Sequence, residues 1–120
     1  MKLKSIDEAT VDVVTKLHAA LSLYGAEEVR FCFRVSPDGS VTAPDYWFIK
    51  QDGTKTKDYP PKSERRSVSD SAQAHWHLVQ DLGQPRWYMM TINLSLAGKY
   101  SMEFEYCDNY HEGDIMKSLD

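Results

Sequence analysis

The stretch that decides the fold is WYMMTINLSLAGKYSMEFEY, residues 87–106. Large apolar or aromatic side chains alternate with other residues on both sides of a turn-forming segment, residues 95–98, as in two paired strands with one buried face. We therefore predict an antiparallel hairpin whose even-numbered residues form the core face. The simplest register pairs Leu94 with Tyr100, Thr91 with Glu103 and Met89 with Glu105. The opposite face, which includes Trp87, Met89, Glu103 and Glu105, is expected to point outward.

Two amphipathic helices are predicted on the N-terminal side of this hairpin. Apolar residues recur every three or four positions over residues 5–24 and again over residues 67–82. Ser5 and Glu8 have the capping-box spacing, in which each side chain satisfies a free backbone donor at the helix start. Gly25 supplies a plausible stop for the first helix.

A second strand pair is predicted between the two helices. Residues 28–35 alternate apolar and polar side chains, and the turn at residues 37–39 leads to a return strand over residues 41–50. Pro44 predicts that this return strand lies at a sheet edge or is broken there. Residues 54–66 are expected to form a mobile basic loop. The chain is therefore predicted to be α+β, with an antiparallel four-stranded meandering sheet, two helices packed on one face, and the order αββαββ.

The composition is that of an ordinary globular protein. The chain has 120 residues, 42% of them hydrophobic and 27% charged, which suits a single domain over residues 1–120. No apolar run approaches the roughly 20 residues of a membrane-spanning helix, and residues 1–4 lead into a polar stretch, so a cytoplasmic location is expected. Cys32 and Cys107 are expected to be reduced, half-exposed thiols on outward strand faces.

No arrangement of residues predicts catalysis or metal binding. His75 and His77 point about 200° apart on a helix and cannot share one metal ion, so His75 is expected to border the core and His77 to face solvent. Neither His18 nor His111 has a nucleophile near it in the sequence. No phosphate-binding glycine loop or hydrolase motif is present. The protein is expected not to be an enzyme and to need no cofactor or metal, and an enzyme using His75 or His111 ranks last.

Two charged segments are candidate binding surfaces. Residues 101–120 carry six carboxylates against one lysine, a net charge of −5, whereas the whole chain has −4. This acidity disfavours nucleic acid and indicates either a basic partner or simple solubility. The candidate partner-binding residues are Trp87, Met89, Glu103, Glu105, Asp108, Tyr110, Glu112 and Asp114. The alternative is a small nucleic-acid-binding module that uses the basic 54–66 segment together with Trp47.

The C-terminal third resembles a known family. The segment from Trp87 to Leu94, the turn Gly98-Lys99-Tyr100 and the run from Glu103 to Asn109 are similar to the C-terminal signature of YezG-like immunity proteins. The aromatic-to-Asp-Gly hairpin of that family is similar to the region between Tyr46 and Gly53. Cys107 stands where the family more often has an acidic residue.

The resemblance implies an antitoxin role. Such a protein would bind and neutralise a cognate bacterial toxin domain, commonly a nuclease of a polymorphic or contact-dependent growth inhibition system. Nucleases hold phosphates with Lys and Arg side chains, so an acidic and aromatic surface that covers the active site or the substrate surface is the expected mode of inhibition. The expected partner is therefore a basic protein toxin domain, and neither nucleic acid nor a membrane.

Overall fold

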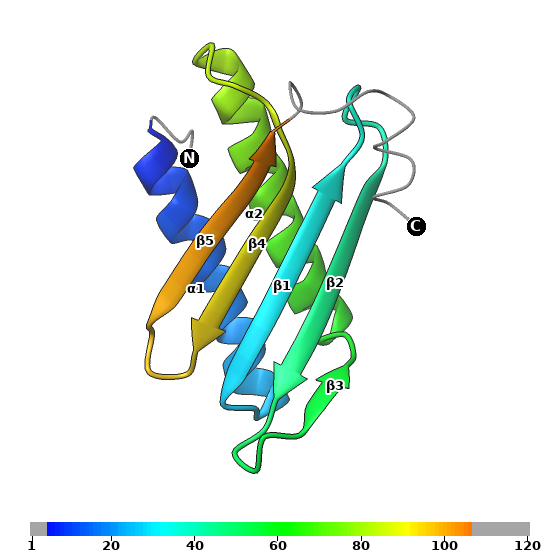
Figure 1. The fold of residues 1–120 in the computed structure, drawn as a ribbon, viewed down its shortest axis with the longest axis vertical. Helices are drawn as coiled ribbons and strands as arrows, with labels where there is room; N and C mark the ends of the chain where they lie inside the picture. The colour runs from blue at the N-terminus through cyan, green and yellow to red at the C-terminus, as the bar shows by residue number, and fades with distance from the viewer. Residues whose placement is uncertain (1–4, 107–120) are drawn as a thin grey trace.

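The computed structural model describes residues 5–106, which form two helices packed on one face of a five-stranded antiparallel sheet (Figure 1). The elements in chain order are α1 (Ile6–Tyr24), β1 (Glu28–Val35), β2 (Thr42–Ile49), β3 (Lys55–Lys57), α2 (Lys62–Asp81), β4 (Trp87–Ser95) and β5 (Tyr100–Tyr106). The α+β class and the placement of both helices on one face are confirmed.

The sheet is not the predicted four-stranded meander. Its strand order is β3-β2-β1-β4-β5, so the chain builds outward from β1 to β3, crosses over through α2, and returns to pair β4 with the other side of β1. The predicted order αββαββ lacks the third strand that follows β2, and the predicted meander is wrong because β1 and β4 are neighbours at the centre of the sheet. Alternation within a strand defines which face is buried, but it does not define which strands are neighbours.

The first helix begins and ends where the sequence predicts. The Ser5 hydroxyl accepts a hydrogen bond from the backbone N–H of Glu8 at 3.1 Å. Gly25 ends the helix with φ of 86°, in the left-handed region that favours glycine, and its N–H donates to the carbonyl of Leu21.

The sequence predicts a loop over residues 54–66, and this prediction is wrong. Lys55–Lys57 pairs with the end of β2, and α2 begins at Lys62, five residues before the predicted start. Pro60 and Pro61 stand before the first turn of the helix, where a missing N–H costs nothing because that donor has no intrahelical partner. Adjacent prolines therefore mark the start of this helix instead of preventing it.

The register predicted for the β4–β5 hairpin is confirmed at all three pairs: Leu94 with Tyr100, Thr91 with Glu103 and Met89 with Glu105. The alternation fails only at the beginning of β4. There Trp87 pairs with Tyr106, so Tyr88 is an extra residue and the strand contains a β-bulge.

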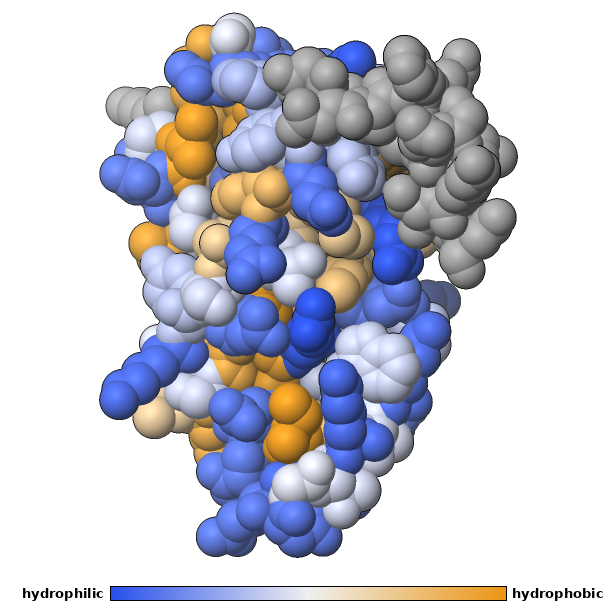
Figure 2. All heavy atoms as spheres, in the orientation of Figure 1, coloured by the Kyte–Doolittle hydropathy of each residue, from blue (hydrophilic) through white to orange (hydrophobic). Residues whose placement is uncertain are grey.

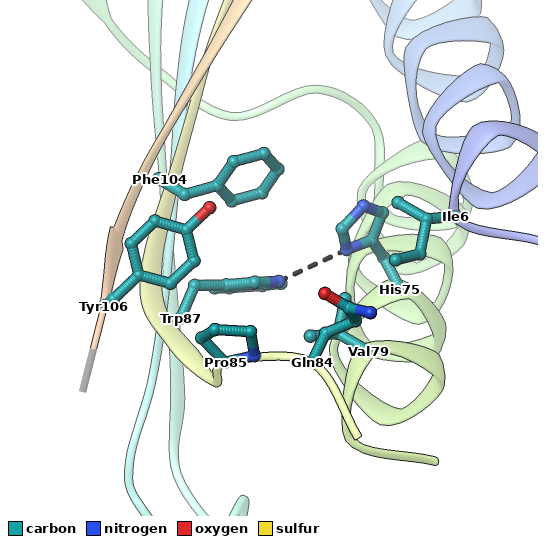
Figure 3. Close-up of a pocket in the computed structure, with 8 residues that line it drawn as sticks. All are labelled: Ile6, His75, Val79, Gln84, Pro85, Trp87, Phe104 and Tyr106. Carbon is teal, nitrogen blue, oxygen red and sulfur yellow. Dashed lines mark hydrogen bonds between the residues drawn. The ribbon is translucent and has the colours of Figure 1, made fainter. Parts of the chain in front are cut away.

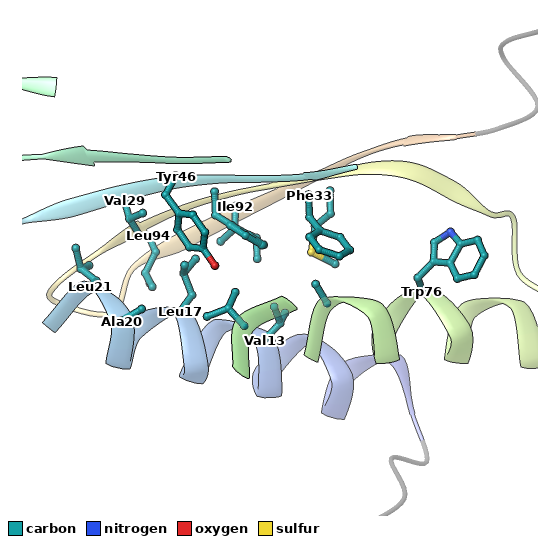
Figure 4. Packing of buried hydrophobic residues seen from close by; sticks show 14 of the residues in the cluster. Val13, Leu17, Ala20, Leu21, Val29, Phe33, Tyr46, Trp76, Ile92 and Leu94 are labelled. Atoms are coloured by element: carbon teal, nitrogen blue, oxygen red, sulfur yellow. The ribbon is translucent and has the colours of Figure 1, made fainter. Parts of the chain in front are cut away.

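The core lies between the helices and the helix-facing side of the sheet (Figure 4). Leu17 and Leu21 of α1 and Trp76 of α2 face aromatic and aliphatic residues of the central strands, such as Phe33 and Ile92. The helices also contact each other through Asp12, which accepts hydrogen bonds from Ser71 of α2 and from Lys16. Burial raises the pKa of Asp12, but these hydrogen bonds outweigh it and leave the pKa lowered, so the carboxylate is charged at neutral pH.

Candidate functional site

The face of the sheet opposite the helices is uncovered by any element of residues 5–106, and we call it the open face. The view in Figure 2 is onto this face, where polar side chains dominate and smaller apolar areas lie between them. Cross-strand pairing divides its charged residues into two groups. One group lies on β1, β2 and β3, and the other lies on β5 beside β4.

The acidic group consists of Glu103 and Glu105, which occupy successive outward positions on β5. Both side chains are exposed, and Met89 lies opposite Glu105 and is half-buried. Among the described residues no cation lies within ion-pairing distance of either carboxylate. The predicted positions of Met89, Glu103 and Glu105 on the outward face are confirmed, and the structure brings them together.

Trp87 does not belong to this surface, and the prediction that it faces outward is wrong. The bulge at Tyr88 reverses the alternation, so Trp87 points to the helix side with Tyr106, and only 1% of its surface is exposed. Its indole N–H donates to Nδ1 of His75 at 3.2 Å. A single extra residue has thus moved the largest side chain of β4 from the proposed binding face into the core.

The other proposed contacts lie outside the described residues. These are Asp108, Tyr110, Glu112 and Asp114, together with the cysteine Cys107. The structure therefore bears on the strand part of the predicted surface and not on the acidic segment that follows it.

One cluster of charges on the other half of the open face is paired. Asp45 of β2 accepts contacts from Arg34 of β1 at 3.0 Å and from Lys57 of β3 at 3.4 Å. The ammonium groups of Lys55 and Lys57 lie over the ring of Trp47, 5.2 and 5.5 Å from its centroid. Two of the three lysines in the 54–66 segment proposed for a nucleic-acid surface are thus engaged with neighbouring side chains.

A cavity of about 410 Å³ opens on the helix side of the sheet, near the end of β5 (Figure 3). Its lining is largely apolar and aromatic: Ile6, His75, Val79, Gln84, Pro85, Trp87, Phe104 and Tyr106. Among residues 5–106, no acidic or basic side chain lines it apart from the imidazole of His75. The described part of the lining thus suits apolar groups.

His75 is buried at the wall of this cavity, as expected for a histidine that borders the core, whereas His77 is exposed. Trp87 can only donate, so Nδ1 of His75 must accept, and the neutral ring carries its proton on Nε2, 3.4 Å from the Thr10 hydroxyl. Burial lowers the pKa of His75 to about 4. A ring held neutral in one tautomer serves here as a core hydrogen-bonding group.

The residues 5–106 contain no group of three or more His, Cys, Asp or Glu side chains that could hold a metal ion. Cys32 lies on the outward side of β1, as predicted, but it is buried beside Thr91 instead of half-exposed, with the two side-chain heteroatoms 3.8 Å apart. None of the helices in this part of the chain is long and apolar enough to cross a membrane.

The sequence reasoning missed the network that joins Thr10, His75 and Trp87. The helical spacing already placed His75 on the apolar side of its helix, so its burial had a signal. The bulge at Tyr88, which turns Trp87 toward His75, had no signal in the sequence, because it depends on the pairing of Trp87 with Tyr106.

A scan against models of protein families and a search of curated proteins found no match for this chain.

Proposed function

We propose that this protein is a cytoplasmic immunity protein that binds and neutralises a basic bacterial toxin domain, with a nuclease as the favoured target class. It acts by binding and not by catalysis. The partner surface comprises Met89, Glu103 and Glu105 on the open face, together with the acidic segment that follows β5 in the sequence.

The observation that carries this proposal is the contrast between Asp45 and the two carboxylates of β5 on the same face of the sheet. Asp45 has two cationic neighbours within 3.4 Å, whereas Glu103 and Glu105 have none among residues 5–106. Exposed carboxylates without an internal partner remain available to attract a basic protein and to accelerate its association. The net charge of −5 over residues 101–120 acts in the same direction.

The alternative of a nucleic-acid-binding module is less well supported. A base can stack on Trp47 only where a face of its ring is free. The ammonium groups of Lys55 and Lys57 lie over this ring and compete with a base for it. Lys57 is also partly neutralised by Asp45. We expect a titration with single-stranded oligonucleotides at low salt to show no binding, and salt-dependent binding there would favour the alternative.

Co-expression tests the proposed function directly. The toxin encoded by the adjacent reading frame is expressed in a sensitive host with and without this protein, and survival is measured. We expect the protein to restore growth. Equal killing in both cultures would show that the chain is not the immunity protein for that toxin.

Charge reversal then tests the surface. The double variant Glu103→Lys with Glu105→Lys should associate with the toxin about ten-fold more slowly at low ionic strength, with a smaller difference at high salt. The matched control reverses two exposed carboxylates of α2, Asp70→Lys with Asp81→Lys, and changes the net charge by the same amount. An equal slowing in both variants would mean that net charge, and not the β5 surface, steers the toxin.

A further inference from the structure

The two edges of the sheet differ in their capacity to accept another strand. At one edge, β3 has only three residues with lysine at both ends, and it covers β2 only from Trp47 to Ile49. The exposed remainder of β2 contains Pro44, which has no N–H to offer. Short strands, lysines and prolines are the usual means by which proteins prevent edge pairing.

The other edge has none of these features. Strand β5 runs for seven residues without proline, lysine or an internal bulge, and in the described part of the chain β4 is its only strand neighbour. Its helix-facing row is apolar but incompletely covered. Tyr100 and Tyr106 are 48% and 38% exposed, and Met102 and Phe104 are half-buried.

The outward backbone groups of β5 can be identified from the hairpin. The N–H of Ser95 donates to the carbonyl of Lys99 at 2.8 Å, so these two residues form a hydrogen-bonded pair. Such pairs alternate with non-hydrogen-bonded pairs along an antiparallel ladder. Counting along the register, Glu103 is in a hydrogen-bonded pair with β4, whereas Met102 and Phe104 are not. The N–H and C=O groups of Met102 and Phe104 therefore point to the free edge.

We propose that the edge of β5 accepts a strand from a partner protein, and that this strand alternates basic and apolar residues. Its basic side chains lie beside Glu103 and Glu105 on the open face. Its apolar side chains lie on the other face beside Met102 and Phe104, near the mouth of the aromatic cavity. The proposal specifies how the partner class under Proposed function is bound and rests on that function for the partner's basic character.

A second copy of this chain fits the same edge poorly in two of the three longest antiparallel registers. Two β5 strands paired antiparallel over their full length put Glu103 opposite Glu103, and a shift of the centre to Phe104 puts Glu103 opposite Glu105. Like charges directly opposite each other destabilise a strand pair. In these two registers the carboxylates favour a basic strand over a second copy, whereas a register centred on Met102 puts Glu103 opposite Ser101 and Glu105 opposite Lys99.

The first test uses the unaltered full chain and a seven-residue peptide that alternates valine and lysine, to match the length of β5. Amide hydrogen exchange is measured by NMR. We expect exchange at Met102 and Phe104 to slow about ten-fold on saturation, while the Glu103 amide, already bonded to β4, is unchanged. A peptide of the same composition with its lysines in one block is the control. Absence of protection, or equal protection by the block peptide, would overturn the proposal.

The second test removes one edge donor. Met102→Pro deletes an outward N–H without breaking a bond to β4, and Met102→Ala removes the same side chain but keeps the donor. We expect the proline variant to bind the alternating peptide at least about ten-fold more weakly and the alanine variant less than about three-fold. Equal losses would mean that the side chain, not the backbone edge, binds the peptide. If the proline variant fails to fold, the exchange measurement on the unaltered chain decides.

The two proposals fail in different ways. If the protein rescues cells from the toxin but Met102→Pro rescues as well as Met102→Ala, strand addition is wrong and the immunity function stands. If the alternating peptide protects Met102 and Phe104 but no toxin is neutralised, the edge binds basic strands and the immunity function is wrong.

Discussion

Strands β4 and β5 belong to one hairpin and carry the same alternation, yet they occupy different environments. Ile92 of β4 is fully buried, whereas its direct partner Met102 on β5 is half-buried; Leu94 is 2% exposed, whereas its partner Tyr100 is 48% exposed. The residue types are comparable, so the difference comes from position. Strand β4 lies between β1 and β5 above the helices, and β5 lies at the edge.

The comparison teaches that an apolar row can have two uses within one hairpin. On β4 it is part of the core and stabilises the fold. On β5 it is left partly uncovered beside two carboxylates that have no ion-pair partner within residues 5–106, which is the composition of a protein-binding surface: apolar contact area next to charge. The following predictions test how far this division between the two strands holds.

The largest expected effect is on stability, and it compares two residues that face each other across the ladder. Ile92→Ala should lower the free energy of unfolding by about 3 kcal/mol, because it leaves a cavity in the core. Met102→Ala should lower it by less than about 1 kcal/mol, because the side chain is already half in water. Urea unfolding followed by tryptophan fluorescence measures both. Equal losses would show that β5 contributes to the core as strongly as β4.

A second prediction concerns the buried end of β4, where Trp87 donates to His75. The unfolded chain protonates this histidine near pH 6.5, whereas the folded chain keeps it neutral to about pH 4. Between these values the unfolded state binds more protons, so stability should fall as the pH is lowered, by about 2 kcal/mol in all. Above pH 6.5 this contribution should not change.

The control for this pH dependence is His75→Gln. Glutamine can accept a hydrogen bond from Trp87 and donate one to Thr10, but it does not titrate. Stability measured by urea unfolding at several pH values should lose its slope between pH 6.5 and about pH 5 in the variant, whereas below pH 5 Asp12, whose pKa is lowered, adds a slope of the same sign in both proteins. If the free energy of unfolding of the original protein and of the His75→Gln variant changed equally with pH, the pH dependence would come from groups other than His75.

The smallest expected effect concerns the open face. Glu103→Gln with Glu105→Gln should change the free energy of unfolding by no more than about 0.5 kcal/mol, because neither carboxylate has an internal partner among the described residues. Asp45→Asn should cost about 1 kcal/mol, since it weakens contacts to both Arg34 and Lys57. Thermal unfolding of the two variants makes the comparison. A larger loss from the Glu103 and Glu105 variant would give these residues a structural role.

Much of the local structure could be predicted, because its causes are local. The Ser5 cap, the Gly25 stop and the hairpin register each depend on residues within one turn or one hairpin. The start of α2 was missed because prolines were treated as blocking a helix that they precede. The short strand β3 was missed because three residues carry too little pattern to be distinguished from a loop.

The candidate site was predictable only in part. Alternation correctly placed Met89, Glu103 and Glu105 on the open face, since each lies in a regular part of the ladder. Trp87 was misplaced because a bulge changes the face of every residue beyond it. Whether a carboxylate is paired also depends on residues far away in sequence: Asp45 lies close to Arg34 and Lys57 only because their strands are neighbours in the sheet.

The sequence by itself determined the helices, the two hairpins and the apolar face of each strand, because these follow from residue spacing and from capping and turn residues. Only the tertiary structure decided that β4 lies inside the sheet and β5 at its edge. That placement depends on the pairing of β1 with β4, which brings together segments about 60 residues apart in the sequence. This pairing is favoured by burial of the whole core, and no local sequence pattern specifies it. The edge of β5 and its carboxylates, which are both without a partner within residues 5–106, follow from it.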